Sequence, residues 1–221
     1  MFPLKDRAPT KIFPFINLLF ICVNIVIFIY EIKMGSKLND FVINNAIIPY
    51  KITHPNIFNI IDIKKLIFPF IISIFLHGGW IHLIGNIWYL WIFGDNIEDR
   101  LGHFKYFLFY FFCGWIASLI HIIFNPNSQI PCIGASGAIA GVLGAYLIIF
   151  PKTKILTLVP IFMFLKIIEL PAFLILFLWF AIQFLNGTTT IITSNTGGIA
   201  HWAHIGGFLT GIFTISVLHK K

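Results

Sequence analysis

Charged residues are scarce in this chain. Lysine, arginine, aspartate and glutamate make up 10% of its 221 residues, against 58% hydrophobic residues, and the mean hydropathy is +0.92. A soluble domain carries about 25% charged residues, so the composition excludes an ordinary soluble protein and predicts lipid as the main solvent. The net charge of +7 does not indicate nucleic-acid binding, because the cations flank apolar stretches instead of forming a stripe on a polar domain.

Cysteines and intramembrane carboxylates are also few. The three cysteines stand in separate segments without CxxC spacing, which does not support a disulfide framework or a thiolate zinc site. The absence of an HExxH motif and of paired aspartates in the apolar runs leaves no basis for zinc or aspartyl protease chemistry. Four histidines are the remaining metal-ligand candidates, and they lack acidic or thiolate partners, so we expect no metal. They are His77, His82, His201 and His204.

Long apolar runs are what the chain has instead. About 20 apolar residues form a helix that crosses the hydrocarbon core, and the uncharged runs, cut at Gly, Pro and Asn, predict six such helices. They lie at approximately 12–31, 78–94, 105–124, 135–150, 165–185 and 200–218. The fourth is short and rich in small residues, so it needs neighbours around it. We therefore expect one all-α membrane domain over 1–221, a six-helix bundle with a long external loop at 31–77.

The distribution of cations predicts the orientation of this bundle. An even number of spans places both termini on one side of the membrane. Lysine and arginine number ten on that side and five on the other, all five in the 31–77 loop. The positive-inside rule then puts both termini in the cytoplasm. Within the loop, Phe41–Ile48 and Leu66–Ile74 either lie in the membrane interface or pack as ordinary loop structure.

Polar residues open three non-adjacent spans on the external side. The second span begins with HGGWIHLIGN at 77–86, the fourth with GASG at 134–137 and the sixth with AHWAHIGG at 200–207. Polar groups in lipid usually point into the bundle, so we expect them to meet in one internal cavity. Within the second span, His82 and Asn86 are four residues apart and share a helical face.

Glycines predict that the fourth and sixth spans pack closely. Gly207 and Gly211 leave one face of the sixth span flat, and the fourth offers a matching surface through small-xxx-small spacing at Gly137, Gly141 and Gly144. Such an approach would let His204 reach Ser136. The alternative is that the glycines only pack helices and that Ser136 is one small residue among them.

A serine beside a histidine points to nucleophilic catalysis, because the imidazole is the usual base for a serine hydroxyl. In the second half of the chain the one carboxylate is Glu169, which we predict at the wrong end of its helix, so a Ser–His dyad is expected. GASGA does not match the nucleophile elbow of soluble hydrolases. Asn86, His82 and the backbone N–H of Ser136 are candidate donors to an oxyanion.

Three motifs together resemble those of the rhomboid intramembrane serine proteases. They are HGGWIHLIGN, GASGA and AHIGGFLTG, spread in that order from His77 to Gly211, and Gly94-x-x-x-Glu98-x-x-x-Gly102 resembles a structural element of the same family. The resemblance implies hydrolysis of single-span or multi-span membrane proteins near the outer ends of their transmembrane segments, without a cofactor. It also implies the minimal prokaryotic form, in a plasma or inner membrane.

The resemblance assigns roles by position. Ser136 corresponds to the nucleophile and His204 to the general base, while His82, Asn86 and the Ser136 amide correspond to the oxyanion hole. Supporting or packing positions are Gly134, Gly137, Gly207, Gly211, His77 and His201. A swap that makes His201 the base stays open, although the glycine spacing favours His204. The fifth span would be a lateral gate, and its stripe of Phe173, Phe177, Phe180 and Phe184 is otherwise a packing or lipid-facing surface.

Two further points stay open. The family's first loop often carries a Trp-Arg pair, and 31–77 contains neither residue, so its anchoring is not predicted. A non-catalytic membrane binding protein on the same fold is one alternative function, which the presence of both Ser136 and His204 disfavours. A small transporter is another, which the lack of intramembrane carboxylates and of an inverted repeat disfavours.

Overall fold

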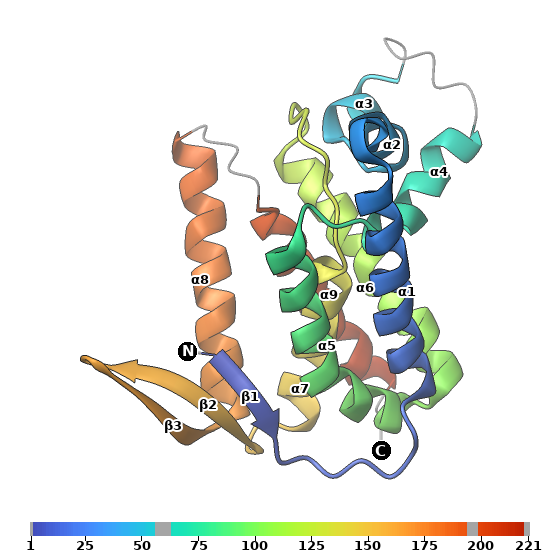
Figure 1. Cartoon of the computed structure of the whole chain (residues 1–221). Helices are drawn as coiled ribbons and strands as arrows, with labels where there is room; N and C mark the ends of the chain where they lie inside the picture. Colours follow the sequence, from blue (N-terminus) through green and yellow to red (C-terminus); the bar gives the residue numbers. More distant parts are fainter. Residues whose placement is uncertain (1, 56–62, 194–198, 219–221) are drawn as a thin grey trace.

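The chain folds into a helical bundle with a small sheet at one end (Figure 1). The computed structural model describes residues 2–55, 63–193 and 199–218. The long helices are α1 (Phe15–Lys33), α5 (Trp80–Leu101), α6 (His103–Phe124), α7 (Ser136–Ile149), α8 (Ala172–Thr193) and α9 (His201–Leu218). Between α1 and α5 lie α2 (Leu38–Asn45), α3 (Pro49–Thr53) and α4 (Ile63–Ile72), with short 3₁₀ turns at Gly35–Lys37 and Ser73–Phe75.

Several of these helices have the length and apolarity of membrane spans. In the described part of the chain, four pass this test alone, namely α1, α6, α8 and α9, and α5 passes together with Ile67–Phe75, from which it is bent by 88°. The 14 residues of α7 rise only about 21 Å, which is less than the hydrocarbon thickness. Every residue from Gly137 to Tyr146 is buried, so neighbouring helices cover α7. The protein is therefore a mostly helical, multi-pass membrane protein.

The predicted spans correspond to α1, α5, α6, α7 and α9, with shifted ends, but the fifth is wrong at its start. Residues 165–171 belong to a strand, and α8 begins only at Ala172. Glu169 lies in that strand and not in a helix, where it binds Arg7 at 3.0 Å and Lys154 at 3.2 Å. A segment that holds such ion pairs stays out of the hydrocarbon, which explains the later start of α8.

The sheet was not predicted and corrects the all-α expectation. Its strands are β1 (Phe2–Asp6), β2 (Lys154–Ile161) and β3 (Phe164–Pro171), antiparallel in the order β1-β2-β3. Along β2, Ile155, Thr157 and Val159 are buried in alternation. A short apolar run does not reveal from periodicity alone whether it forms a helix or a strand, and residues 165–171, expected in the fifth span, form most of β3.

The Gly94, Glu98 and Gly102 motif joins α1 to α5. The Glu98 carboxylate accepts hydrogen bonds from the backbone N–H groups of Ile16 at 2.9 Å and Asn17 at 2.7 Å, which are first-turn donors without helical partners. A methyl group at Gly94 would overlap the Asn17 side chain. Gly102 has φ +75°, a left-handed conformation that favours glycine and turns the chain from α5 into α6.

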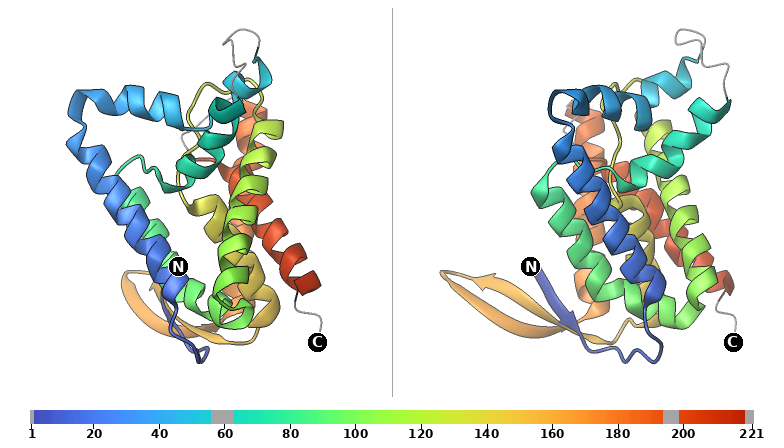
Figure 2. Two further views of the ribbon diagram at one scale, coloured as in Figure 1. Left: turned by 90° about the vertical axis from the view of Figure 1, so that its right-hand side faces the viewer. Right: turned by 45° about the vertical axis from the view of Figure 1, so that its right-hand side comes forward.

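The loop between α1 and α5 has its own anchors in place of a Trp-Arg pair. The buried Glu31 carboxylate of α1 accepts a hydrogen bond from the backbone N–H of His77 at 3.1 Å. The backbone N–H of Cys132, in the segment before α7, donates to Ile47 at 2.7 Å. The loop helices α2, α3 and α4 thus lie at the end of the bundle opposite the sheet (Figures 1 and 2).

Candidate active site

A cavity of about 860 Å³ lies between α5, α8 and the first turns of α7 and α9. Most of its wall is apolar. The polar side chains on its wall include His82, Asn86, Ser136, Gln183 and His204. The polar openings of three non-adjacent spans therefore meet in one place, and α8 adds a fourth contribution.

Ser136 and His204 are in direct contact in this cavity. Ser136 is the first residue of α7, and His204 lies one turn into α9. His204 Nε2 is 2.8 Å from Ser136 Oγ. The two side chains are only partly exposed, so the pair lies in a pocket that water can enter.

Glycines allow the two helices to come this close. A methyl group at Gly207 would overlap the carbonyl oxygen of Gly137, and one at Gly211 would overlap that of Gly141. The backbones of α7 and α9 therefore touch, which is the close packing that small residues permit between membrane helices. A hydroxyl on the short serine side chain can then reach an imidazole on the neighbouring helix.

The other ring nitrogen of His204 contacts a residue that the sequence analysis missed. His204 Nδ1 is 2.9 Å from Oε1 of Gln183 on α8, and His201 Nδ1 is 2.8 Å from the same oxygen. Both histidines thus share Gln183, and of the two His204 is the one that contacts Ser136. Gln183 was detectable in principle, because it is the one amide in the apolar stretch from Ala172 to Leu185, and polar residues in membrane helices often mark function.

The candidate oxyanion donors converge beside Gly134. A methyl group built at Gly134 would lie 2.5 Å from Nε2 of His82 and 3.5 Å from Nδ2 of Asn86. Gly134 has φ +114° and leads into α7 two residues before Ser136. The first N–H groups of a helix have no partner within it, so the backbone N–H of Ser136 is available for a ligand at the same place.

His77 orients Asn86. The Asn86 side-chain nitrogen donates to Nε2 of His77 at 2.9 Å, and His77 Nδ1 in turn donates to the carbonyl of Phe75 at 3.1 Å. An amide nitrogen carries two protons, so the second proton of Asn86 is available to the cavity. The supporting position expected for His77 thus has a defined set of contacts.

The four candidate metal-ligand histidines have other partners. His77 contacts Asn86, and His82 Nδ1 accepts from the backbone N–H of Gly78 at 3.5 Å, whereas His201 and His204 both contact Gln183. In residues 2–55, 63–193 and 199–218, no three His, Cys, Asp or Glu side chains cluster as metal ligands would.

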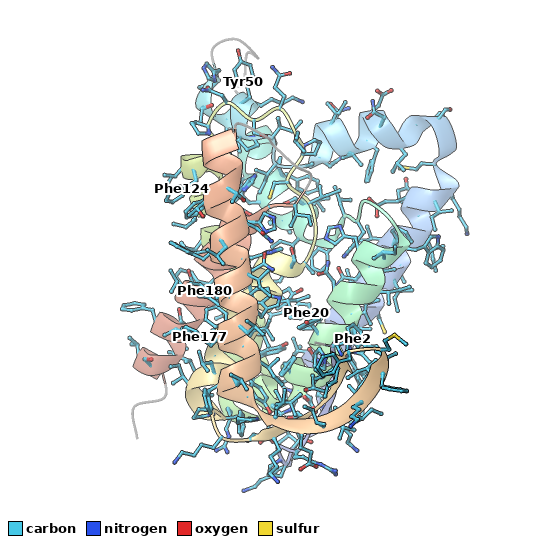
Figure 3. All side chains as sticks on the ribbon, turned by 90° about the vertical axis from the view of Figure 1, so that its left-hand side faces the viewer. Phe2, Phe20, Tyr50, Phe124, Phe177 and Phe180 are labelled. Carbon is cyan, nitrogen blue, oxygen red and sulfur yellow. The ribbon has the colours of Figure 1, made fainter. Side chains whose placement is uncertain are left out.

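The phenylalanine stripe of α8 faces two ways. Phe177 is 65% exposed, whereas Phe180 stacks on Phe208 of α9 with ring centroids 4.9 Å apart; both are labelled along α8 in Figure 3. Trp179, also on α8, lies 5.9 Å from the His204 ring. The stripe therefore combines a packing surface and a lipid-facing surface.

Comparison with known proteins gives a consistent result. A family model described as the Rhomboid domain matches residues 64–221. Rhomboid-like protein 11, chloroplastic, of Arabidopsis thaliana is 28% identical over 158 residues, covering 69% of this chain and 53% of that protein. Presenilin-associated rhomboid-like protein, mitochondrial, of Bos taurus is 30% identical over 166 residues, covering 71% and 40%.

A third relative, RHOMBOID-like protein 6, mitochondrial, of Arabidopsis thaliana, is 31% identical over 156 residues, covering 68% of this chain and 45% of that protein. The chain thus spans about half the length of these relatives or less. The family model nevertheless matches well over half of the chain. The chain belongs to the rhomboid family.

Proposed function

We propose that this chain is an intramembrane serine endopeptidase that cleaves peptide bonds in or near the transmembrane segments of other membrane proteins. Ser136 is the nucleophile and His204 the general base. The observation that carries the proposal is the 2.8 Å contact between His204 Nε2 and Ser136 Oγ inside a cavity of a membrane-spanning bundle. Membership of the rhomboid family supports an intramembrane protease-type function.

The chemistry follows from this contact. Ser136 Oγ attacks the scissile carbonyl carbon while its proton passes to His204 Nε2. The negative charge on the carbonyl oxygen is stabilised by the Ser136 backbone N–H, His82 and Asn86. The C–N bond then breaks as His204 gives its proton to the leaving amine, and a water molecule hydrolyses the acyl-enzyme by the same steps.

The substrate must present an extended segment to this cavity. Peptide groups in a membrane helix are hydrogen-bonded within the helix, so the segment to be cleaved unwinds first, which Gly, Pro and other weak helix formers favour. The cavity has walls from both α5 and α8, so we propose entry between these helices, with α8 as the gate.

The orientation is also part of the proposal. Counting the buried α7 as a span gives six helices in one domain over 1–221, with both termini in the cytoplasm and the 31–77 loop outside, as the positive-inside rule predicts. Of the cations used in that count, Lys64, Lys65, Lys220 and Lys221 lie where the structure describes no side chain. The prokaryotic plasma or inner membrane stays a prediction, since the relatives named above are mitochondrial or chloroplastic.

The decisive experiment combines active-site labelling with cleavage. We expect a fluorophosphonate probe to label the reconstituted protein and a single-span reporter substrate to be cleaved. Ser136→Ala and His204→Ala should each abolish both signals while membrane insertion stays normal. Ser118→Ala is the matched control, because Ser118 is a buried serine whose hydroxyl donates to the Gly114 carbonyl of its own helix at 2.9 Å.

Two outcomes would contradict the proposal. Normal cleavage by Ser136→Ala membranes would show that another group is the nucleophile. A correctly inserted wild-type protein that is neither labelled nor active, but that retains a client membrane protein, would indicate a binding protein on the same fold.

A further inference from the structure

Gln183 is the one polar amide in a long apolar stretch of α8. From Ala172 to Leu185 every other side chain is a hydrocarbon, apart from the indole of Trp179. A polar group in a membrane helix is costly and is retained where it has a task. Gln183 lines the cavity of Ser136 and His204, so its task is to be sought there.

The contacts of Gln183 determine where the imidazole protons are. Its Oε1 lies 2.9 Å from Nδ1 of His204 and 2.8 Å from Nδ1 of His201. An amide oxygen accepts two hydrogen bonds and donates none, so both imidazoles donate from Nδ1. A neutral His204 protonated at Nδ1 has its lone pair on Nε2, the atom 2.8 Å from Ser136 Oγ.

We propose that Gln183 is the positioning residue of the dyad: its side-chain oxygen holds His204 in the Nδ1–H tautomer, so that Nε2 can accept the serine proton. This inference rests on the proposed protease function. In Ser-His-Asp enzymes an aspartate in this position fixes the tautomer and orientation of the histidine. Here a neutral amide from a third helix takes that place.

An amide suits this position for two reasons. An ionised carboxylate would be expensive in a membrane-embedded site without a cation beside it, whereas an amide supplies an acceptor at lower cost. His201 then matters because its Nδ1–H also points to Oε1, so two donors hold the amide oxygen toward α9. If the amide were turned over, its NH₂ would donate to Nδ1 and place the His204 proton on Nε2, facing Ser136.

Because of this contact, the tautomer of His204 depends on how α8 packs against α9. Gln183 belongs to α8 and His204 to α9, and Phe180 stacks on Phe208 one turn away from the contact. An α8 displaced from α9 would therefore withdraw the acceptor from His204 without moving Ser136.

The first test needs no variant. In protein labelled with ¹⁵N-histidine, the nitrogen shifts report which ring atom carries the proton, and His204→Asn identifies the His204 signals. We expect Nδ1 to be protonated and Nε2 unprotonated in the resting protein at neutral pH. A His204 protonated at Nε2 would overturn the proposal.

The second test uses Gln183→Leu, which puts a shorter apolar side chain in place of the amide and removes the acceptor, and Gln183→Glu, which keeps an acceptor oxygen. Leu185→Ala is the control, because Leu185 is on α8 and 62% exposed. We expect Gln183→Leu to mix the His204 tautomers and to lower kcat about 10- to 100-fold, the scale for a misplaced catalytic group, with KM within about twofold. Gln183→Glu should keep the Nδ1–H tautomer and recover most of the rate, and the control should match wild type.

The outcomes separate this inference from the proposed function. A Gln183→Leu protein with the wild-type tautomer and kcat would overturn the positioning role, as would a Gln183→Glu protein that keeps the tautomer but is as slow as Gln183→Leu. If Gln183→Leu does not fold, the His204 tautomer in wild type and the rate of Gln183→Glu still test the positioning role. A wild-type protein that neither cleaves nor takes up the fluorophosphonate refutes the protease proposal, while its histidine spectrum still tests the Gln183 contact.

Discussion

At the scale of single residues, Gly134 is the most constrained position near the site. Its φ of +114° disfavours any other residue, and a methyl group there would lie 2.5 Å from His82 Nε2. We expect Gly134→Ala to lower kcat at least about 100-fold through displaced oxyanion donors and to cost about 1–3 kcal/mol of stability through backbone strain. Reporter cleavage and thermal unfolding measure the two effects.

Gly35→Ala is the control that separates the effect of backbone strain from the effect of displaced oxyanion donors. Gly35 also has a positive φ, +53°, but a methyl group there would have nothing within 4 Å. The variant should lose stability and keep the wild-type kcat. A Gly134→Ala protein as active as Gly35→Ala would show that His82 and Asn86 do not contribute to the reaction.

The sequence indicates some residues of the candidate site and not others. Ser136, His204, His82 and Asn86 stand in recognisable patterns, because each is fixed by spacing within a helix or by a glycine-rich motif. Gln183 stands in no motif, and its contact with His204 joins residues 21 positions apart across two helices. The angle and depth at which α8 packs on α9 decide that contact, and neither follows from periodicity.

At the scale of helices, the glycine contact between α7 and α9 sets the distance of the dyad. Gly211 lies nearly two turns beyond His204, and a methyl group there would overlap the carbonyl of Gly141. We therefore expect Gly211→Ala to separate the helices, to cost about 1–3 kcal/mol through overpacking and to lower fluorophosphonate labelling of Ser136. Unfolding in mixed micelles and the labelling rate are the measurements.

Gly85→Ala is the matched control for stability alone, because Gly85 lines the cavity of Ser136 and His204. Gly85 is also a helix glycine, but a methyl group there would meet nothing within 4 Å, so helix propensity should make the variant up to about 1 kcal/mol more stable. A Gly211→Ala protein with the stability of Gly85→Ala and the labelling rate of wild type would mean that the α7–α9 distance does not control the site.

The sheet carries a prediction of pH dependence. Lys154 and Arg7 hold the pKa of the Glu169 carboxylate below its ordinary value, so the ionised form is favoured in the folded sheet. This contribution is present above the ordinary glutamate pKa and is lost as the pH falls through the lowered folded value. We expect the backbone amides of β1 to be better protected from hydrogen exchange in wild type than in Glu169→Gln at pH 5 to 7, with the difference vanishing below roughly pH 4.

The comparison with Glu169→Gln is needed because the stability that Asp6 contributes changes with pH in the opposite direction. Burial raises the pKa of Asp6 in β1, so its contribution is present at low pH and is lost as the pH rises through that raised value. Taking the difference between the two proteins removes the Asp6 effect. A difference that persists unchanged at pH 3, or one insensitive to salt, would mean that the exposed Glu169 ion pairs do not hold β1.

At the scale of the whole molecule, the question is whether α7 crosses the membrane. With the native cysteines replaced, we expect Asn127→Cys and Lys152→Cys to react with an impermeant maleimide from opposite sides of oriented vesicles. Both positions are exposed; Asn127 lies in the loop between α6 and α7, and Lys152 lies in the turn after α7. Labelling of both from one side would make α7 a re-entrant segment and reduce the bundle to five spans.

The sequence by itself determined that the protein lies in a membrane, that it is mostly helical and which motifs it carries. Apolar runs can form only helices or closed barrels in lipid, because every backbone group must find its partner inside the protein. Polar residues at the starts of three spans likewise had to point inward. These inferences depend on local composition and spacing, which the sequence states directly.

The tertiary structure decided what depends on distant partners. Residues 165–171 were expected in the fifth span, and the structure places them in β3, which pairs with β2, while β2 pairs with β1 about 150 residues away. The 31–77 loop is held by Glu31 and by Cys132, which no local pattern links. The histidine that meets Ser136 was selected by the packing of α7, α8 and α9, because a hydrogen bond requires its two atoms within about 3 Å, a condition that only the assembled bundle satisfies.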